Sequence, residues 1–325
     1  MSTIAVLERN RVVGQRIARV MCAAGRLAEV PTVDEPFKLH SLFSARPRVL
    51  GCDALHLDEA RALLADYPTL HLIVWTTDEV SRVLSLAQEE PRISSIIGWP
   101  SFESMPRPWE IALGTARVLE PSGARPRLSD LLGWGATILK WRPQTSRERD
   151  QAVSEVVRWS GRAGAPARTA ERLGELAHEL LMNAMYDAPL DRNRFPRYSH
   201  DRKQDIFLEE AEVPTLRLGT DGVHIALQVI DPFGALRRHH VFEGILRGIN
   251  AKTSGEHAAV LDTSGGGAGL GMIKIYTAGA VLIIDVEQNA ETSVTSFYDL
   301  DVNPREQRSL PVSLHFFEAP PRRPS

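Results

Sequence analysis

A carboxylate and an amide lie one helical turn apart in the second half of the chain, at Glu179 and Asn183. Both border the apolar face of a predicted helix, and polar side chains at such a margin can line a cleft. A carboxylate there can accept a proton or orient a nucleophile. The carbonyl oxygen of an asparagine suits Mg²⁺, which prefers hard oxygen ligands. A solvated helix edge is the alternative for the pair taken alone.

Asp231 comes at the end of an apolar strand, in the run Asp231-Pro-Phe-Gly234. An aspartate in this place can accept a hydrogen bond from an exocyclic amine such as that of adenine. The glycine would let the backbone come close to the base. The alternative is a strand that simply ends in a Pro-Gly turn.

Five glycines between residues 264 and 271 lead into an apolar segment, Met272 to Tyr276. Glycines free backbone amides to surround an anion, and a helix that begins there directs its positive end at phosphate. The spacing is neither that of a Walker A loop nor that of a Rossmann fingerprint. A flexible linker is the alternative, although linkers do not usually run straight into an apolar helix.

Taken in this order, the three segments resemble the N, G1 and G2 boxes of the GHKL ATPases, which include gyrase, Hsp90, MutL and histidine-kinase catalytic domains. Glu179-x-x-x-Asn183 is similar to the N box, Asp231-x-x-Gly234 to the G1 box, and Gly267-Ala-Gly-Leu-Gly271 to the G2 box. The resemblance extends over roughly residues 136–300. It implies an α+β two-layer sandwich of the GHKL (Bergerat) type that binds ATP and Mg²⁺, with an ATP lid over about residues 239–263.

The nearest likeness within the family is to the serine kinases that act as anti-sigma factors. There the N-box glutamate is read as the general base for a protein serine hydroxyl, so the resemblance implies Glu179 as the catalytic base. It also implies Asn183 as the Mg²⁺ ligand and Asp231 as the adenine contact. Phe233 stands where the G1 box usually has glycine, which bears on the adenine side of the site. The further nucleotide contacts implied are Asp187, Gly234, Gly265, Gly266, Gly267, Gly269, Leu270 and Gly271.

The resemblance implies a protein serine/threonine kinase or a partner-switching regulator of the anti-sigma type. A catalytically idle ATP-binding module that controls a protein partner is the first alternative. A histidine-kinase-like catalytic domain that acts in trans is the second. His178 precedes Glu179 as in a phosphoacceptor box, but the same helix supplies the N box, so we expect a structural role for His178.

Short apolar runs alternate with helical patterns over the first 120 residues, which indicates βαβ units and a parallel sheet. This half resembles the receiver domains of response regulators, whose fold is flavodoxin-like. Asp53 lies where the phosphoacceptor would be, and Thr76 or Thr77 where the switch hydroxyl would be. Only Glu8 remains of the acidic pair, and Trp99 replaces the lysine, so we expect a degenerate receiver. Phosphorylation of Asp53 and a phosphorylation-independent interaction module both stay open.

The predicted domains are a receiver-like domain over 1–120, a linker over 121–128, the GHKL domain over 129–318 and a flexible tail over 319–325. Proline and glycine punctuate the linker, and nothing periodic spans it. Helices on one face of a mixed sheet are expected for the second domain. The predicted strands are 4–7, 48–52, 70–76, 93–97, 136–141, 223–230, 280–286, 293–300 and 312–316. The predicted helices are 12–24, 57–67, 78–88, 109–119, 146–162 and 167–186, and 191–203 is predicted as a surface loop.

The charge balance creates no field that attracts a polyanion, because 38 basic and 41 acidic residues leave a formal net charge of −3. We therefore expect neither nucleic acid nor a membrane as partner. Two cysteines without metal-ligand spacing suit a reducing compartment, and the N-terminus lacks a signal-peptide pattern. These features predict a cytoplasmic protein. The two resemblances together imply a signalling protein that has a protein partner, as regulator or substrate, and that can form a homodimer.

Overall fold

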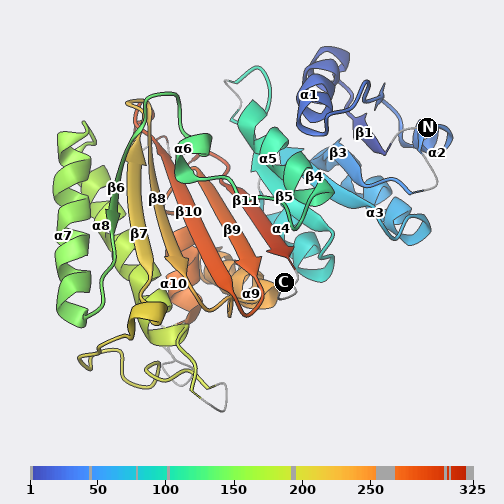
Figure 1. Cartoon of the computed structure of the whole chain (residues 1–325). Helices are drawn as coiled ribbons and strands as arrows, with labels where there is room; N and C mark the ends of the chain where they lie inside the picture. Colours follow the sequence, from blue (N-terminus) through green and yellow to red (C-terminus); the bar gives the residue numbers. More distant parts are fainter. Residues whose placement is uncertain are drawn as a thin grey trace. The chain divides into compact units, whose positions relative to one another are not determined.

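The computed structural model describes residues 3–43, 46–77, 80–100, 103–191, 195–253, 268–303, 306 and 309–319. The chain divides into two compact units. Unit 1 comprises Met1–Gly123 and Leu310–Phe317, and unit 2 comprises Ala124–Ser309 and Glu318–Ser325. Both contain helices and strands (Figure 1), so the prediction of a mixed α/β structure is confirmed. None of the described helices is long and apolar enough to cross a membrane.

A parallel sheet forms the centre of unit 1, with strands in the order β2-β1-β3-β4-β5. This is the order of flavodoxin-like doubly wound sheets. The sequence does not predict the short β2 and α2, whereas the other elements up to α5 lie within two residues of their predicted bounds. The strands are β1 (Ile4–Leu7), β2 (Thr32–Val33), β3 (Val49–Asp53), β4 (His71–Thr76) and β5 (Ile93–Gly98). The helices are α1 (Arg11–Ala24), α2 (Leu39–Leu42), α3 (Leu57–Asp66), α4 (Val80–Glu89) and α5 (Pro108–Leu119).

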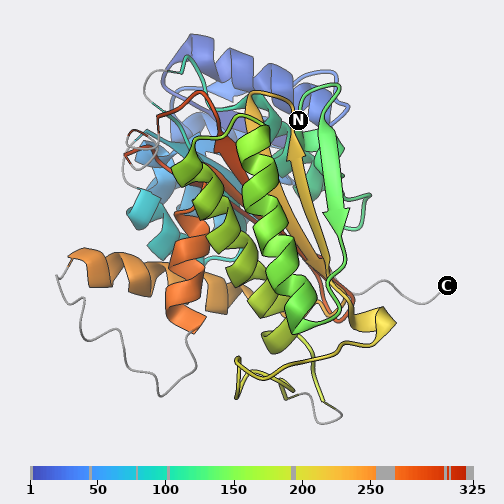
Figure 2. The ribbon, with the colours of Figure 1, turned by 90° about the vertical axis from the view of Figure 1, so that its left-hand side faces the viewer.

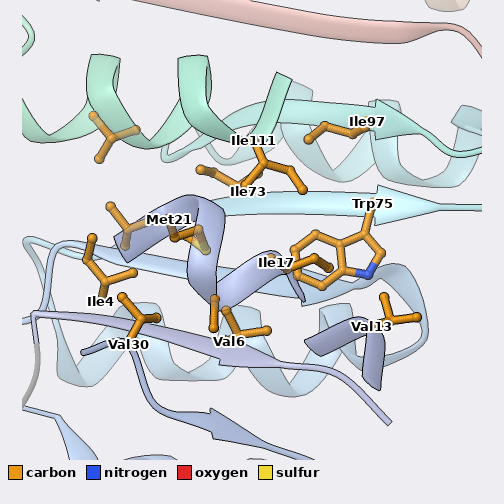
Figure 3. Close-up of a cluster of buried hydrophobic side chains, with 13 residues drawn as sticks. Ile4, Val6, Val13, Ile17, Met21, Val30, Ile73, Trp75, Ile97 and Ile111 are labelled. Carbon is orange, nitrogen blue, oxygen red and sulfur yellow. The ribbon is translucent and has the colours of Figure 1, made fainter. Parts of the chain in front are cut away.

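Apolar side chains from α1, α5 and the sheet form a core in unit 1 (Figure 3). Ile17 and Met21 of α1 lie with Ile73 and Trp75 of β4, and all four are fully buried. Complete burial of an aliphatic side chain of this size contributes about 1.5–3 kcal/mol. This core fixes the carboxyl ends of β1, β3 and β4, where the sequence predicts the receiver site.

A sixth strand, β11 (Ser313–Ala319), pairs antiparallel with β5 of unit 1. His315 of β11 is fully buried, with Nδ1 3.0 Å from Ser95 Oγ and Nε2 2.8 Å from Glu110 Oε2. Burial alone would raise the pKa of Glu110, but His315 and Arg107 beside it hold that pKa below its usual value. The sequence predicts this strand but places it in the second domain, since its partners lie 220 and 205 positions away along the chain.

The strands of unit 2 form a sheet in the order β9-β10-β8-β7-β6, and every described pairing within it is antiparallel, where the sequence predicts a mixed sheet. Helices α7 and α8 lie side by side, and α8 and α10 pack on the sheet (Figure 2). The strands are β6 (Thr137–Trp141), β7 (Thr215–Thr220), β8 (His224–Asp231), β9 (Val281–Glu287) and β10 (Glu291–Asp299). The helices are α6 (Leu128–Leu131), α7 (Ser146–Arg162), α8 (Ala167–Met182), α9 (Arg238–Thr253) and α10 (Ala268–Tyr276).

Helix α9 occupies the first part of the segment that was expected to be an ATP lid. Val241, Phe242 and Ile245 of this helix are buried. A Cβ added at Gly248 would lie 2.4 Å from Cβ of Ile273 in α10, so the two helices touch through this glycine. Residues 238–253 therefore form a packed helix, and residues 254–263, the rest of the predicted lid, lie outside the described residues.

Candidate functional site

Glu179 lies on α8, against the first turns of α10. Its Oε1 is 3.2 Å from Nζ of Lys274, and a Cβ added at Gly271 would lie 3.1 Å from its Oε2. The structure therefore brings the predicted base against the helix that follows the glycine-rich segment. Lys274 was not predicted from the sequence. Its position three residues after Gly271 is the signal that could have found it, because both residues then lie on one side of the helix.

Asn183 lies where α8 ends and a wider, π-helical turn begins. Residues Asn183–Asp187 form this turn, in which the backbone N–H of Ala188 donates to the carbonyl of Asn183 over 2.9 Å. Such turns inside α-helices are rare and occur frequently at functional sites. The Asn183 side chain is half-buried, and its amide makes no hydrogen bond to any described residue. It is available to a ligand.

Asp187 ends the π-helical turn and is paired with Arg202, which follows in the predicted surface loop. Burial raises the pKa of Asp187, and the adjacent Arg202 opposes that shift. The sequence predicts Asp187 as a nucleotide contact, whereas in the structure its carboxylate is already engaged.

Asp231 is the last residue of β8, and only 8% of it is exposed. Its Oδ1 accepts a hydrogen bond from the backbone N–H of Phe233 over 3.0 Å. Burial raises the pKa of Asp231 to about 7, against the opposing effect of the Phe233 and Gly234 amides. The carboxyl group is therefore partly protonated at neutral pH, and it can either accept or donate a hydrogen bond.

Gly234 has a backbone φ of +58°, in the left-handed region that favours glycine. A Cβ at this position would lie 2.0 Å from the carbonyl oxygen of Glu287 and 2.8 Å from the backbone nitrogen of Asn289. The close approach that this glycine allows is to the turn between β9 and β10. The sequence had suggested an approach to a base instead.

The glycine-rich segment is described only from Ala268 onward, where α10 begins. The predicted helix after the glycines is thus present, and Gly271 is buried in it. Gly269 and Leu270 belong to its first turn, and Gly265, Gly266 and Gly267 lie outside the described residues.

A cavity of about 770 Å³ lies beside Glu179, between α7, α8 and α10. Val153 of α7 and Ile275 of α10 contribute apolar walls, and Glu179 and Lys274 line the same space. Asn183 and Asp231 do not line it, although the π-helical turn that begins at Asn183 packs near β8. The structure therefore joins Glu179 to Gly271 more directly than to Asp231.

A second cavity, of about 820 Å³, lies between the start of α7, the end of α8 and residues 202–205. Arg149 lines it, with its guanidinium 5.6 Å from the ring centre of Tyr186 and hydrogen-bonded to Asp150. His178 lines both cavities. Partial burial and the charge of Arg149 lower the pKa of His178, so it is neutral at pH 7. The sequence did not predict this cavity.

The acidic groups at the carboxyl ends of the unit 1 strands are engaged within the unit. The buried Glu8 accepts a hydrogen bond from Nε1 of Trp75 over 2.7 Å. Asp53 accepts one from the backbone N–H of Leu55, also over 2.7 Å. Trp99 directs its indole N–H at a backbone carbonyl, so it supplies no cation in place of the expected lysine. Glu8 and Asp53 are thus both hydrogen-bonded within unit 1.

No model of a known protein family matches the chain, and no curated protein matches it. In the part of the chain that the structure describes, no group of three or more His, Cys, Asp and Glu side chains could hold a metal ion.

Proposed function

We propose that unit 2 binds ATP with Mg²⁺ as a GHKL-type domain, and that the chain is a cytoplasmic signalling protein with a protein partner. One observation carries the proposal: Glu179 of α8 lies against Gly271 of α10, the helix that follows the glycine-rich segment. A carboxylate beside a segment whose amides can hold phosphate is placed to act at the terminal phosphate. Helices stacked on an antiparallel sheet support the same proposal.

Asn183 would contribute the protein's ligand to Mg²⁺. Its amide is free of hydrogen bonds to the described residues, and its carbonyl oxygen is a hard donor. Mg²⁺ in nucleotide sites needs only one or two protein ligands, because phosphates and water complete its shell. Asp231 would accept a hydrogen bond from the exocyclic amine of adenine. The backbone N–H of Phe233 donates to its carboxyl group and holds that group in place.

Glu179 would serve as the base of a protein serine/threonine kinase. A hydroxyl oxygen of the partner forms a bond to the γ-phosphorus, the bond to ADP breaks, and Glu179 accepts the hydroxyl proton. Catalysis of this kind depends mainly on positioning and charge neutralisation, so a short set of residues is enough.

A catalytically idle nucleotide-binding module is the second candidate, and the ion pair between Glu179 and Lys274 favours it. The Lys274 ammonium, 3.2 Å away, occupies Oε1 of the carboxylate, an oxygen that a partner hydroxyl would otherwise contact. Such a module would control its partner through the nucleotide state alone. The engaged Glu8 and Asp53 support a phosphorylation-independent interaction role for unit 1.

Calorimetric titration of the chain with ATP and Mg²⁺ tests the proposal. We expect saturable binding by the wild type and about tenfold weaker Mg²⁺-ATP binding by Asn183→Ala, because a metal ligand is lost. Gln15→Ala removes an exposed amide of unit 1 and is the matched control, with unchanged affinity expected. A wild-type chain that binds no ATP would show the proposal to be wrong.

Transfer from [γ-³²P]ATP separates the candidates. A kinase should label serine or threonine of its partner in an acid-stable form, and Glu179→Ala should lose labelling while it still binds the nucleotide. Binding without any transfer by the wild type would favour the idle module. Acid-labile label on histidine would favour a histidine-kinase-like domain that acts in trans.

A further inference from the structure

Lys274 connects the proposed base to the helix that follows the glycine-rich segment. Its Nζ lies 3.2 Å from Oε1 of Glu179, and 66% of its side chain is exposed against 21% for Glu179. Lysine carries a compact charge with three donors on a flexible four-carbon stem. An exposed ammonium on such a stem can change partners without moving the helix that bears it.

The position of Lys274 on α10 makes phosphate its natural second partner. It lies one turn after Gly271, and Gly271 itself packs against Glu179. Phosphates held by the amides at the start of α10 would therefore approach the same ammonium that pairs with Glu179. The polyphosphate of ATP carries several negative charges, whereas Glu179 carries one.

The ion pair is weak enough to be replaced. Pairs with one largely exposed partner change an equilibrium by about two- to fivefold. Charge-assisted hydrogen bonds to phosphate are stronger than contacts between exposed charged side chains. The competition therefore favours phosphate whenever the nucleotide is present.

We propose that Lys274 is a positioning residue that holds Glu179 while the site is empty and moves to the phosphates when ATP binds. Nucleotide binding then releases the Glu179 carboxylate for a hydroxyl group of the protein partner, and an empty site keeps the carboxylate occupied. This inference rests on the proposed ATP binding by unit 2. Occupancy of the site by nucleotide would determine whether the Glu179 carboxylate is paired with Lys274 or free.

A double-mutant cycle on ligand affinity tests the inference, with calorimetry on the wild type, Glu179→Gln, Lys274→Met and the double variant. With or without Lys274, Glu179→Gln removes the electrostatic repulsion between the Glu179 carboxylate and the phosphates of ATP. If Lys274 leaves Glu179 on binding, however, the substitution should tighten Mg²⁺-ATP binding about two- to fivefold more in the wild type than in the Lys274→Met background. With adenosine, which has no phosphate, this difference should vanish.

Lys274→Met alone should weaken Mg²⁺-ATP binding about tenfold and leave adenosine affinity unchanged, and Lys274→Arg should restore most of the loss. Lys140→Met, at an exposed lysine of β6, is the control and should change neither affinity. Equal effects of Glu179→Gln in both backgrounds, or equal losses for ATP and adenosine, would overturn the inference while ATP binding stands. A wild type that binds neither ligand overturns the proposed function and the inference with it.

Discussion

Asp231 illustrates how burial sets the chemistry of a single side chain. The residue is held at the end of β8 with its pKa raised to about 7, above the 3.8 of an ordinary aspartate. The folded chain therefore binds a proton at Asp231 more tightly than the unfolded chain does. The stability that this proton brings is fully present below about pH 4 and is lost as the pH rises through about 7.

Asp231→Asn should remove this dependence, because an amide does not titrate and its carbonyl can still accept a backbone hydrogen bond. Relative to the wild type, the variant should gain about 2–3 kcal/mol in free energy of unfolding between pH 5 and pH 8. Urea unfolding of both proteins at the two pH values measures the gain. A constant difference between them would mean that Asp231 does not titrate in this range.

Candidate site residues were easier to select in the sequence than the side chains that contact them. Glu179, Asn183 and Asp231 stood out by type and spacing, because helical and strand periodicities are local. Arg202, which engages Asp187, lies in a loop without periodicity. Lys274 meets Glu179 only through the packing of α10 on α8, between residues 95 positions apart. Contacts of that range depend on the tertiary fold, which one sequence does not specify residue by residue.

At the scale of elements, regular periodicity predicted most helices and strands. Helix α7 has the predicted bounds, Ser146–Arg162. The predicted helix 167–186 is present, but its last turn is π-helical from Asn183 onward. The π-helical turn packs near β8, and the pattern of apolar residues continues through it. Strand β7 was missed although Leu216 and Leu218 alternate in it and are buried.

Helix α9 was missed for a different reason. Val241, Phe242, Ile245 and Ile249 recur with helical spacing, which indicates an amphipathic helix. The resemblance assigned these residues to a lid, and that assignment displaced the local signal. The structure shows that residues 238–253 form the helix that this local pattern indicates.

Gly248 should be essential to the packing of α9 on α10. Gly248→Ala would place a Cβ within 2.4–2.6 Å of three side-chain atoms of Ile273, so the helices must separate. We expect a loss of about 1–3 kcal/mol in free energy of unfolding, measured in urea. Gly161→Ala on α7 is the matched control. No atom lies within 4 Å of its added Cβ, so a gain of about 0.5–1 kcal/mol is expected.

If Gly248→Ala and Gly161→Ala change stability in the same direction, the two helices do not depend on contact through glycine. Because α10 carries Lys274 and Gly271, separation of α9 from α10 should also weaken the proposed ATP binding. The Gly161 control should leave ATP binding unchanged.

At the scale of the whole molecule, each of the two units is built from stretches of sequence that are not continuous. Unit 1 is built from the first 123 residues and from Leu310–Phe317, so the larger part of unit 2, Ala124–Ser309, is inserted between two parts of unit 1. The predicted division at residues 121–128 lies at the first of the three passages between the units, and the sequence does not predict the passages after Ser309 and Phe317. An antiparallel strand added at β5 leaves no local signal of its partner, because the apolar pattern of 312–316 fits any sheet equally well.

Strand β11 is held in unit 1 by side-chain hydrogen bonds as well as by its backbone pairing with β5. The Ser313 hydroxyl accepts a hydrogen bond from the backbone N–H of Gly98 over 2.9 Å. His315 lies between Ser95 and Glu110, and none of these three side chains is exposed. Removal of one partner from a buried, hydrogen-bonded charged group costs about 3–5 kcal/mol. Unit 1 should therefore depend for its stability on residues from the other end of the sequence.

A chain that ends at Ser309 tests this dependence. It lacks β11, so Glu110 stays buried without His315, and the apolar contacts of Leu314 are lost. We expect the free energy of unfolding of unit 1 to fall by several kcal/mol, since each lost large core side chain adds about 2–5 kcal/mol to the penalty of a buried, unpaired Glu110. Hydrogen exchange at the amides of β5, followed by mass spectrometry, reports the change within unit 1.

A chain that ends at Ala319 keeps all of β11 and is the control, with β5 protected as in the full chain. Equal protection of β5 in both shortened chains would mean that unit 1 is stable without β11. Faster exchange only in the chain ending at Ser309 would establish that the first 123 residues need the C-terminal strand to form a stable unit.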